Sequence, residues 1–361
     1  MLPFTIEPTP TPTPAAVRDA ALVDPGFGKL FTDHMVVVRY NAAQGGWVDA
    51  RVTARAPIPM DPASSVLHYA QEIFEGMKAY RLADGSTALF RPDANAQRFQ
   101  ASATRMAMPH VPQDLFIAAV EQLVTIDTDW FPKVEGGALY LRPFMFASEV
   151  FLGVRPALEY LFITIASPVG AYFNGGGAPV TIWASQNYSR AAPGGTGAAK
   201  CGGNYAASLV AQAEATAQGC DQVVFLDAAT RTWVEELGGM NLFFVFDDGS
   251  IITPPLTGTI LPGITRDSII TLARDLGMSV REEPYAFDQW RDDANSGRLR
   301  ETFACGTAAV VTSVGTVKDP NGSFTIGGNQ SGPVTAALRS ALVSLQRGDA
   351  PDPHGWVHRV G

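Results

Sequence analysis

The chain has 361 residues, enough for two domains of ordinary size, and 46% of them are hydrophobic, which is ample for a large core. Only 17% are charged and the formal net charge is −9, which argues against nucleic acid or an anionic membrane as a partner. No apolar run is long enough to span a bilayer and no signal peptide pattern is visible, so we expect a cytoplasmic protein. The cysteines, Cys201, Cys220 and Cys305, show no metal-ligand spacing, and we expect a reduced protein without a metal.

The N-terminal part begins with a segment at 8–14 in which threonine and proline alternate. Proline lacks a backbone N–H and has a fixed φ, so we expect 1–20 to be an extended, disordered tail. A smaller domain is predicted to follow over 21–172. Its pattern predicts strands at 34–40, 47–54, 87–90, 137–146 and 159–167, helices at 95–108 and 113–129, and a short helix running into a strand at 71–80.

The segment 174–179 (NGGGAP) is the clearest linker in the chain, and we place the interdomain connection at 173–179. A larger domain is predicted over 180–361, with strands that alternate with helices. The strands are expected at 179–184, 222–227, 230–235, 242–246, 250–253 and within 301–314, and the helices at 204–218, 267–276 and 333–346. Strands mixed with helices in both halves indicate an α+β or α/β architecture.

Lys200 is the most informative residue of the chain. It stands in the run 194–205 (GGTGAAKCGGNY), with glycine and alanine on both sides. Small neighbours let a flat ligand approach the backbone, and an amine that loses its hydration becomes nucleophilic. A lysine needs these properties to form a Schiff base with pyridoxal phosphate. The alternative, a phosphate-binding P-loop, requires Gly before the lysine and Ser or Thr after it. Ala199 and Cys201 occupy these positions, so that pattern fails at both.

A pair of adjacent carboxylates, Glu235 and Glu236, follows on a predicted strand. A carboxylate can keep the pyridine nitrogen of pyridoxal phosphate protonated, which makes the ring an electron sink. Adjacent strand residues face opposite sides, so one of the two is expected to face the cofactor. The alternation does not decide which one.

A series of short segments matches one known family in chain order. They are 31–35 (FTDHM), 68–69 (HY), 74–80 (FEGMKAY), 89–92 (LFRP) with Arg98, 140–143 (YLRP), 168–173 (PVGAYF), 200–205 (KCGGNY), 236–241 (ELGGMN), 261–266 (LPGITR) and 306–308 (GTA). With these segments the chain resembles the branched-chain amino acid aminotransferases, of the fold type IV (D-amino-acid-transaminase-like) group of pyridoxal phosphate enzymes. The resemblance covers nearly all of 26–345. It implies a two-domain fold, with a smaller N-terminal α/β domain and a larger C-terminal domain that carries the lysine.

The resemblance implies a set of residues that bind pyridoxal phosphate. Lys200 would form the Schiff base and move the proton between the substrate and the cofactor. Glu236, rather than Glu235, would bind the pyridine nitrogen, and Tyr205 the phenolate oxygen. The groups implied for the phosphate are Arg98, the backbone amides of Ile264 and Thr265, and Thr307. The start of a helix at 264–265 suits an anion independently of the resemblance.

The resemblance also implies a substrate site. Its residues would be Tyr69, Phe74, Tyr140, Arg142, Val154, Tyr172, Thr307 and Ala308, with Lys78 in a supporting role. Tyr140 and Arg142 are two apart on a predicted strand, so both can face one side. These two would bind carboxylates, whereas the aromatic and aliphatic side chains would form apolar walls.

The implied reaction is a reversible ping-pong transfer of the amino group of leucine, isoleucine or valine to 2-oxoglutarate, carried out by a homodimer. The alternatives are a D-amino-acid transaminase or an aminodeoxychorismate lyase of the same fold, and a pyridoxal-phosphate-binding protein without catalysis. Two positions depart from the family pattern or are chemically unusual. Gly239 stands where relatives often have threonine, and Cys201 lies beside Lys200, where we expect a packing role.

Overall fold

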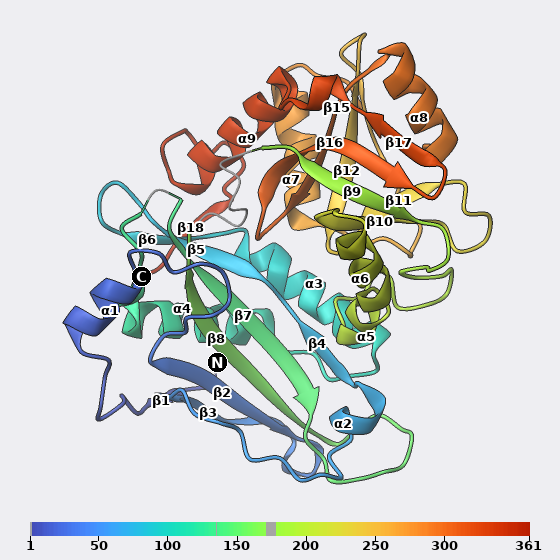
Figure 1. The fold of residues 1–361 in the computed structure, drawn as a ribbon. Coiled ribbons are helices and arrows are strands. Elements are labelled where there is room, and N and C mark those ends of the chain that lie inside the picture. Colours follow the sequence, from blue (N-terminus) through green and yellow to red (C-terminus); the bar gives the residue numbers. More distant parts are fainter. Residues whose placement is uncertain (1, 135, 171–177) are drawn as a thin grey trace. The chain divides into compact units, whose positions relative to one another are not determined.

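The computed structural model describes residues 2–134, 136–170 and 178–361 (Figure 1). Two compact units divide the chain. The first contains Met1–Tyr172, Ala199–Gly202 and Leu345–Gly361, and the second contains Phe173–Ala198 and Gly203–Ser344. Of the predicted linker at 173–179, residues 173–177 lie outside the described part. Within that part, no helix is both long and apolar enough to cross a membrane.

The first unit is built on one mixed sheet, in the order β1-β3-β2-β8-β7-β5-β6-β18, with β4 paired to β7. Its strands are β1 (Phe4–Ile6), β2 (His34–Asn41), β3 (Gly46–Ala54), β4 (Glu72–Phe74), β5 (Met77–Arg81), β6 (Thr87–Phe90), β7 (Ala138–Ala147), β8 (Glu159–Val169) and β18 (Val357–Arg359). Its helices are α1 (Ala15–Ala21), α2 (Val66–Tyr69), α3 (Pro92–Arg105) and α4 (Gln113–Ile126), with short 3₁₀ turns at Ala42–Gln44 and Thr128–Trp130.

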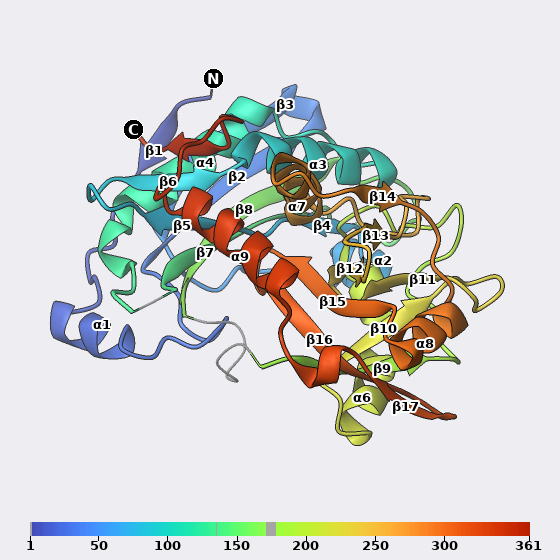
Figure 2. The same ribbon diagram turned by 90° about the horizontal axis from the view of Figure 1, so that it is seen from above.

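Helices α3 and α4 contact each other, and α4 lies along β2, β7 and β8 (Figure 2). Their apolar side chains meet those of the sheet in one core. The rings of Phe99, Phe116 and Phe162 form its centre, with ring centroids 5.4 to 5.9 Å apart, and all three are fully buried. Burial of apolar side chains such as these rings stabilises the unit.

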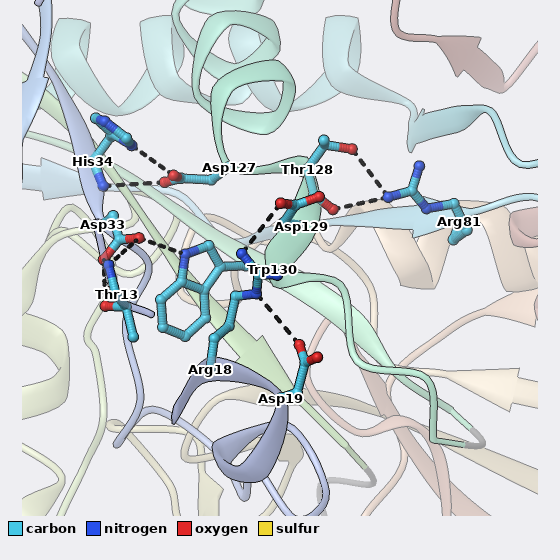
Figure 3. Close-up of polar contacts among 10 residues, drawn as sticks. All are labelled: Thr13, Arg18, Asp19, Asp33, His34, Arg81, Asp127, Thr128, Asp129 and Trp130. Atoms are coloured by element: carbon cyan, nitrogen blue, oxygen red, sulfur yellow. Dashed lines mark hydrogen bonds and ion pairs between the residues drawn. The ribbon is translucent and has the colours of Figure 1, made fainter. Parts of the chain in front are cut away.

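The N-terminal segment has a defined path, which differs from the expected disordered tail. Strand β1 pairs in parallel with β3, and α1 follows the Thr-Pro segment. The backbone N–H of Thr9 donates to His34 Nε2 at 3.0 Å. The hydroxyl of Thr13 donates to Asp33 at 2.6 Å (Figure 3). Distant residues thus satisfy the backbone of a segment that cannot form its own ladder, and a local sequence pattern does not reveal such partners.

Asp127 and Asp33 fix the groups that receive this segment (Figure 3). Asp127 contacts His34 Nδ1 at 2.6 Å and accepts from the backbone N–H of His34 at 3.1 Å. Since Thr9 donates to Nε2, the proton of a neutral His34 lies on Nδ1 and points to Asp127. Asp33 also accepts from the indole N–H of Trp130 at 3.1 Å.

The second unit contains a sheet that closes on itself. Its order is β11-β10-β9-β16-β15-β12-β13-β14, with β17 paired to β16, and β11 also pairs with β12. The strands are β9 (Val180–Ser185), β10 (Gln222–Leu226), β11 (Val234–Leu237), β12 (Met240–Phe246), β13 (Ile251–Thr253), β14 (Val280–Glu282), β15 (Leu299–Gly306), β16 (Val310–Asp319) and β17 (Gly322–Thr325). The ring of pairings runs through β9, β10, β11, β12, β15 and β16. Strand β12 is buried along its whole length.

The helices of the second unit surround this sheet, and α6, α7 and α8 contact its strands. They are α5 (Gly202–Ala206), which begins at the last residue of the first unit, α6 (Leu209–Ala217), α7 (Ile264–Asp275), α8 (Phe287–Ser296) and α9 (Pro333–Gln346), with a 3₁₀ turn at Gly327–Asn329. The rings of Phe243 and Phe303 face each other across β12 and β15 with a centroid distance of 4.9 Å.

The strand predicted at 230–235 is found at Val234–Leu237. Two other predicted elements differ in type or in number from those observed. The segment 71–80 contains strands β4 and β5 and no helix, because both strands pair with β7, and the helix of this region ends earlier, at Tyr69. Tertiary pairing outweighs the local preference here. The single helix predicted at 204–218 is two helices, α5 and α6.

Candidate functional site

The main chain of Lys200 is held by residues of the first unit. Its backbone N–H donates to Ser102 Oγ of α3 at 2.9 Å, and its carbonyl accepts from the N–H of Phe74 at 3.0 Å. The N–H of Gly202 donates to the Glu72 carboxylate, and a β-carbon at Gly202 would overlap that carboxylate. A larger residue at 202 would therefore displace the Glu72 side chain, and the lysine is presented from a backbone held on both sides.

The amine of Lys200 lies next to an aromatic and charged group of side chains. Its Nζ is 4.8 Å from the centroid of the Phe74 ring, and the guanidinium carbon of Arg142 lies 4.8 Å from the same centroid. Arg142 Nη2 donates to the Tyr140 hydroxyl at 3.0 Å. Tyr140 and Arg142 alternate with buried Leu141 and Pro143 on β7, so both project from the same side of the strand. A substrate carboxylate and an apolar side chain could both bind beside this amine.

Arg98 projects from α3 and is held by a residue that the sequence analysis missed. Arg98 Nε lies 2.7 Å from Glu75 Oε1, and Arg98 Nη2 donates to Glu75 Oε2 at 2.8 Å. Burial is the largest influence on the pKa of Glu75 and acts to raise it, but the charges of Arg98 and Lys200 and the hydrogen bonds from Arg98 and Asn95 together outweigh it. The pKa therefore lies below the ordinary value of 4.5. Glu75 belongs to the strongly patterned segment 74–80, which was the available signal.

In the second unit, the two adjacent carboxylates have different partners. Glu236 Oε1 lies 2.6 Å from Arg190 Nη1, and Leu261 donates its N–H to the same oxygen at 3.2 Å. Glu235 instead accepts from the Thr259 hydroxyl at 2.5 Å, and burial raises its pKa. Of the two, Glu236 is therefore the one in a direct ion pair.

Arg190 is the second site residue that the sequence analysis missed. It is buried, and its Nη1 also donates to the Thr259 carbonyl at 3.0 Å. It lies in a loop without a recognisable motif, and its partner Glu236 is distant in sequence. No local signal could have identified it.

Asn241 connects Glu236 to the start of α7. Its Nδ2 donates to Glu236 Oε2 at 3.3 Å and to the Leu261 carbonyl at 3.1 Å. A β-carbon at Gly263 would overlap the Asn241 side chain, so the loop passes very close to it. Ile264 and Thr265 are the first residues of α7, whose first N–H groups have no carbonyl partner within the helix. The positive end of the helix dipole lies here, which suits an anion.

The turn at Gly239 lies close to Tyr205 and to Gly306, the residue before the segment 307–308. A β-carbon at Gly239 would lie 3.7 Å from Tyr205 Cε1, which is ordinary contact, so a threonine β-carbon would fit. A β-carbon at Gly306, the last residue of β15, would lie 3.6 Å from the Gly239 carbonyl oxygen. Thr307 and Ala308 follow Gly306 directly, in the turn between β15 and β16.

Three of the predicted substrate residues are exposed or cannot be placed. Tyr69 at the end of α2 is 40% exposed and its hydroxyl donates to the Leu152 carbonyl. Val154 is 85% exposed, so within a single chain it forms no enclosed wall. Tyr172 lies outside the described residues. Lys78 is buried on β5.

Each unit thus carries one set of the predicted residues. The first unit holds Lys200, Arg98, Phe74, Tyr140 and Arg142, and the second holds Tyr205, Glu236, Ile264, Thr265, Thr307 and Ala308. Among the residues that the structure describes, no group of three or more His, Cys, Asp or Glu side chains could hold a metal ion.

The sequence pattern of the amino-transferase class IV family matches residues 72–317. The chain belongs to the class IV aminotransferases. One relative of this aminotransferase is the "Probable branched-chain-amino-acid aminotransferase" of Streptomyces coelicolor, which is 57% identical over 356 residues that cover 98% of each chain. The predicted family is therefore confirmed, and the P-loop alternative is wrong.

Solved structures of branched-chain amino acid aminotransferases resemble the fold. One from Escherichia coli has a TM-score of 0.76 and 30% identity, covering 91% of this chain and 99% of that one. One from T.th., described "with Pyridoxamine 5'-phosphate", has a TM-score of 0.74 and 29% identity, covering 90% and 98% of the two chains. The predicted fold type IV class is confirmed.

Proposed function

We propose that this class IV aminotransferase transfers the amino group of L-leucine, L-isoleucine or L-valine to 2-oxoglutarate, in a reversible ping-pong reaction that uses pyridoxal phosphate. The observation that carries the proposal is the group around Lys200. An amine on a fixed backbone lies beside an aromatic ring and an arginine–tyrosine pair. The aromatic ring can contact an apolar substrate side chain, and the arginine–tyrosine pair can bind a substrate carboxylate. The names of the relatives support the substrate class.

The residues of the two sets fit pyridoxal phosphate. Lys200 would hold it covalently, and Glu236, kept in an ion pair by Arg190, would bind the pyridine nitrogen. When bound, the cofactor supplies an electron sink for the carbanion formed at the substrate Cα. Tyr205 would bind its phenolate oxygen. We assign the phosphate to Arg98, to the N–H groups of Ile264 and Thr265, and to Thr307.

The chain's own catalytic work falls to Lys200. As a free amine, Lys200 would be the base that takes the proton from the substrate Cα, and in the reverse direction the acid that gives the proton back to Cα. The backbone bonds from Lys200 to Ser102 and Phe74 fix the point from which its side chain extends. Such positioning lowers the entropic part of the barrier.

Arg142 is expected to serve glutamate more than leucine. Its guanidinium can pair with the side-chain carboxylate of glutamate, which leucine lacks, whereas the Phe74 ring beneath it can contact either substrate. We expect Arg142→Ala to lower kcat/KM for L-glutamate by about tenfold or more, the value for a lost charge-assisted hydrogen bond, and for L-leucine by much less. Steady-state kinetics with both donors measure this difference. Tyr140→Phe removes the hydroxyl that Arg142 contacts and should shift the ratio in the same direction. Equal losses for both donors would refute this division of labour.

We propose that the enzyme is a homodimer in which the loop at 150–154 is covered by a second copy. The loop and its neighbour expose several large apolar side chains, which are Tyr69, Val150, Phe151, Leu152 and Val154. Contiguous apolar surface of this kind is typical of an interface. Coverage by the partner would also bury Tyr69 and Val154, so that they could form the apolar walls of the substrate site.

An exposed charge in this loop should weaken the dimer. We expect Val154→Asp to shift the particle mass, measured by sedimentation equilibrium, from two chains of 38.4 kDa towards one. Val17→Asp is the matched control, because Val17 is an exposed valine on α1. A wild-type protein that sediments as a single chain at micromolar concentration would contradict the dimer.

The experiment that tests the function is an absorption spectrum of the purified protein before and after addition of L-leucine. A yellow protein that loses its visible band with L-leucine, and regains it with 2-oxoglutarate, supports both half-reactions. A protein that stays colourless after addition of pyridoxal phosphate refutes the cofactor. A yellow protein that responds to D-alanine but not to L-leucine points to a D-amino-acid transaminase, and one that responds to neither points to binding without catalysis.

The free cysteines Cys201, Cys220 and Cys305 support a cytoplasmic location.

A further inference from the structure

We propose that Glu75 is a positioning residue that fixes the Arg98 guanidinium for the cofactor phosphate, an inference that rests on the proposed function. Glu75 stands between β4 and β5, and Arg98 lies on α3. The two bonds between them, 2.7 Å at Nε and 2.8 Å at Nη2, form a bidentate pair along one edge of the guanidinium. A carboxylate on one edge fixes the plane of the guanidinium, and a planar guanidinium of fixed orientation suits bidentate recognition of a phosphate.

The carboxylate of Glu75 is saturated by partners. Besides Arg98, its Oε2 accepts from Asn95 Nδ2 at 2.7 Å and from the N–H of Gly76 at 3.1 Å. The side chain is 0% exposed, and that of Arg98 is 10% exposed. A buried carboxylate is tolerated only when its hydrogen bonds are made, and here four of them fix its orientation. Glu75 is therefore a rigid acceptor against which Arg98 is held.

The same helix face connects Glu75 to Lys200. Asn95, Arg98 and Ser102 are three and four residues apart on α3, and residues at this spacing share one face. Asn95 and Arg98 bind Glu75, whereas Ser102 accepts from the backbone of Lys200 at 2.9 Å. One helix thus aligns the phosphate arginine with the lysine that would hold the cofactor's other end.

The energetic advantage of this arrangement is preorganisation. A free arginine side chain has many rotamers, and binding a phosphate would have to order them. Glu75 has already ordered Arg98 in the folded protein, so phosphate binding costs less entropy. A group that acts this way should affect the affinity for the phosphate and leave the affinity for the rest of the cofactor almost unchanged.

The test compares pyridoxal phosphate with pyridoxal, which lacks the phosphate. The dissociation constants of both are measured by absorption titration of the cofactor-free full-length protein, for wild type and for Glu75→Gln. The ratio of the dissociation constant of pyridoxal to that of pyridoxal phosphate reports the contribution of the phosphate. We expect this ratio to fall by about tenfold or more in Glu75→Gln. Arg98→Met should lower the same ratio, and the double variant should lower it little further, because Glu75 acts through Arg98.

Two further variants control this comparison. Asp319→Asn removes a similar buried carboxylate, paired with Arg291 at 2.6 Å in the second unit, and should leave the ratio unchanged. Asn95→Ala removes one bond to Glu75 while keeping the ion pair, and should lower the ratio by a smaller factor. It tests the same inference if Glu75→Gln fails to fold.

A Glu75→Gln protein that binds both compounds more weakly by the same factor would overturn the inference, since a merely structural carboxylate, or one acting on the charge of Lys200, gives that result. So would a double variant whose effects add. If wild type binds neither compound, the proposed cofactor fails. If wild type strongly prefers pyridoxal phosphate and Glu75→Gln keeps the full preference, the cofactor stands and the role of Glu75 does not.

Discussion

Lys200→Ala is expected to lower the turnover of L-leucine with 2-oxoglutarate by roughly 10⁴-fold or more, because the variant lacks both the amine that holds the cofactor and the base that moves the proton. The fold should survive the change. Lys200 is anchored through its backbone N–H and carbonyl, at 2.9 and 3.0 Å, and both groups remain in alanine. The coupled transamination assay measures the loss, and thermal unfolding of the cofactor-free protein measures the fold.

The matched control is Lys133→Ala, because Lys133 is an exposed lysine of the same unit. It should keep wild-type turnover. The variant Lys200→Ala should also fail to form the covalent cofactor complex, so borohydride treatment should leave no pyridoxal group on the protein. Normal turnover in Lys200→Ala would disprove the catalytic assignment, whatever the spectrum shows.

Glu236→Gln is expected to lower kcat by about 10²-fold or more, because an amide cannot keep the pyridine nitrogen protonated and the ring becomes a weaker electron sink. The substitution also leaves Arg190, which is buried, without its charged partner at 2.6 Å. Removing one member of a buried pair destabilises a protein by about 3–5 kcal/mol, so a lower unfolding temperature is expected as well. Activity should therefore be compared at a temperature at which the variant is folded, as judged by circular dichroism.

Glu235→Gln is the matched control for this prediction, since it makes the same chemical change one residue away. Burial raises the pKa of Glu235 above 4.5, so ionising it costs folding free energy. The free energy of unfolding of the wild type therefore falls as the pH rises above 4.5, because the buried Glu235 has to ionise. The glutamine variant has no group to ionise there and keeps its stability.

We expect Glu235→Gln to keep most of its activity and to gain stability relative to wild type between pH 4.5 and pH 8, measured by denaturant unfolding. If Glu235→Gln lost as much activity as Glu236→Gln, the assignment of the pyridine carboxylate to Glu236 would fail. Activity retained in both would remove the carboxylate from the mechanism.

The features that local sequence could predict are those that depend on a residue and its near neighbours. Lys200 was identified from the small residues around it, and the common side of Tyr140 and Arg142 from their spacing on a strand. The buried strands β7 and β8 were predicted from apolar runs bounded by glycine and proline. In each case the physical cause lies within a few residues of the feature.

The features that escaped depend on partners far away in the sequence. Glu75 belongs to the site through its ion pair with Arg98, and Arg190 through its ion pair with Glu236. Folding brings the two partners of each pair together from separate segments. The path of the N-terminal segment depends on His34 and Asp33 in the same way. Strand alternation alone left the choice between Glu235 and Glu236 open, and the resemblance proposed Glu236. Both residues are buried, and they differ in their partners, Thr259 for Glu235 and Arg190 for Glu236.

The assignment of Ala199–Gly202 and Leu345–Gly361 to the first unit has a consequence for protein engineering. A gene cut at the glycine-rich segment after residue 172 would not yield two self-sufficient halves. The shorter product would keep Phe74, Tyr140 and Arg142 but would lack the reactive lysine. It would also lose β18, so that β6 would become an unpaired sheet edge of the kind that promotes aggregation. Domain shuffling in this enzyme therefore has to move the excursion at 199–202 and the C-terminal strand together with the N-terminal unit.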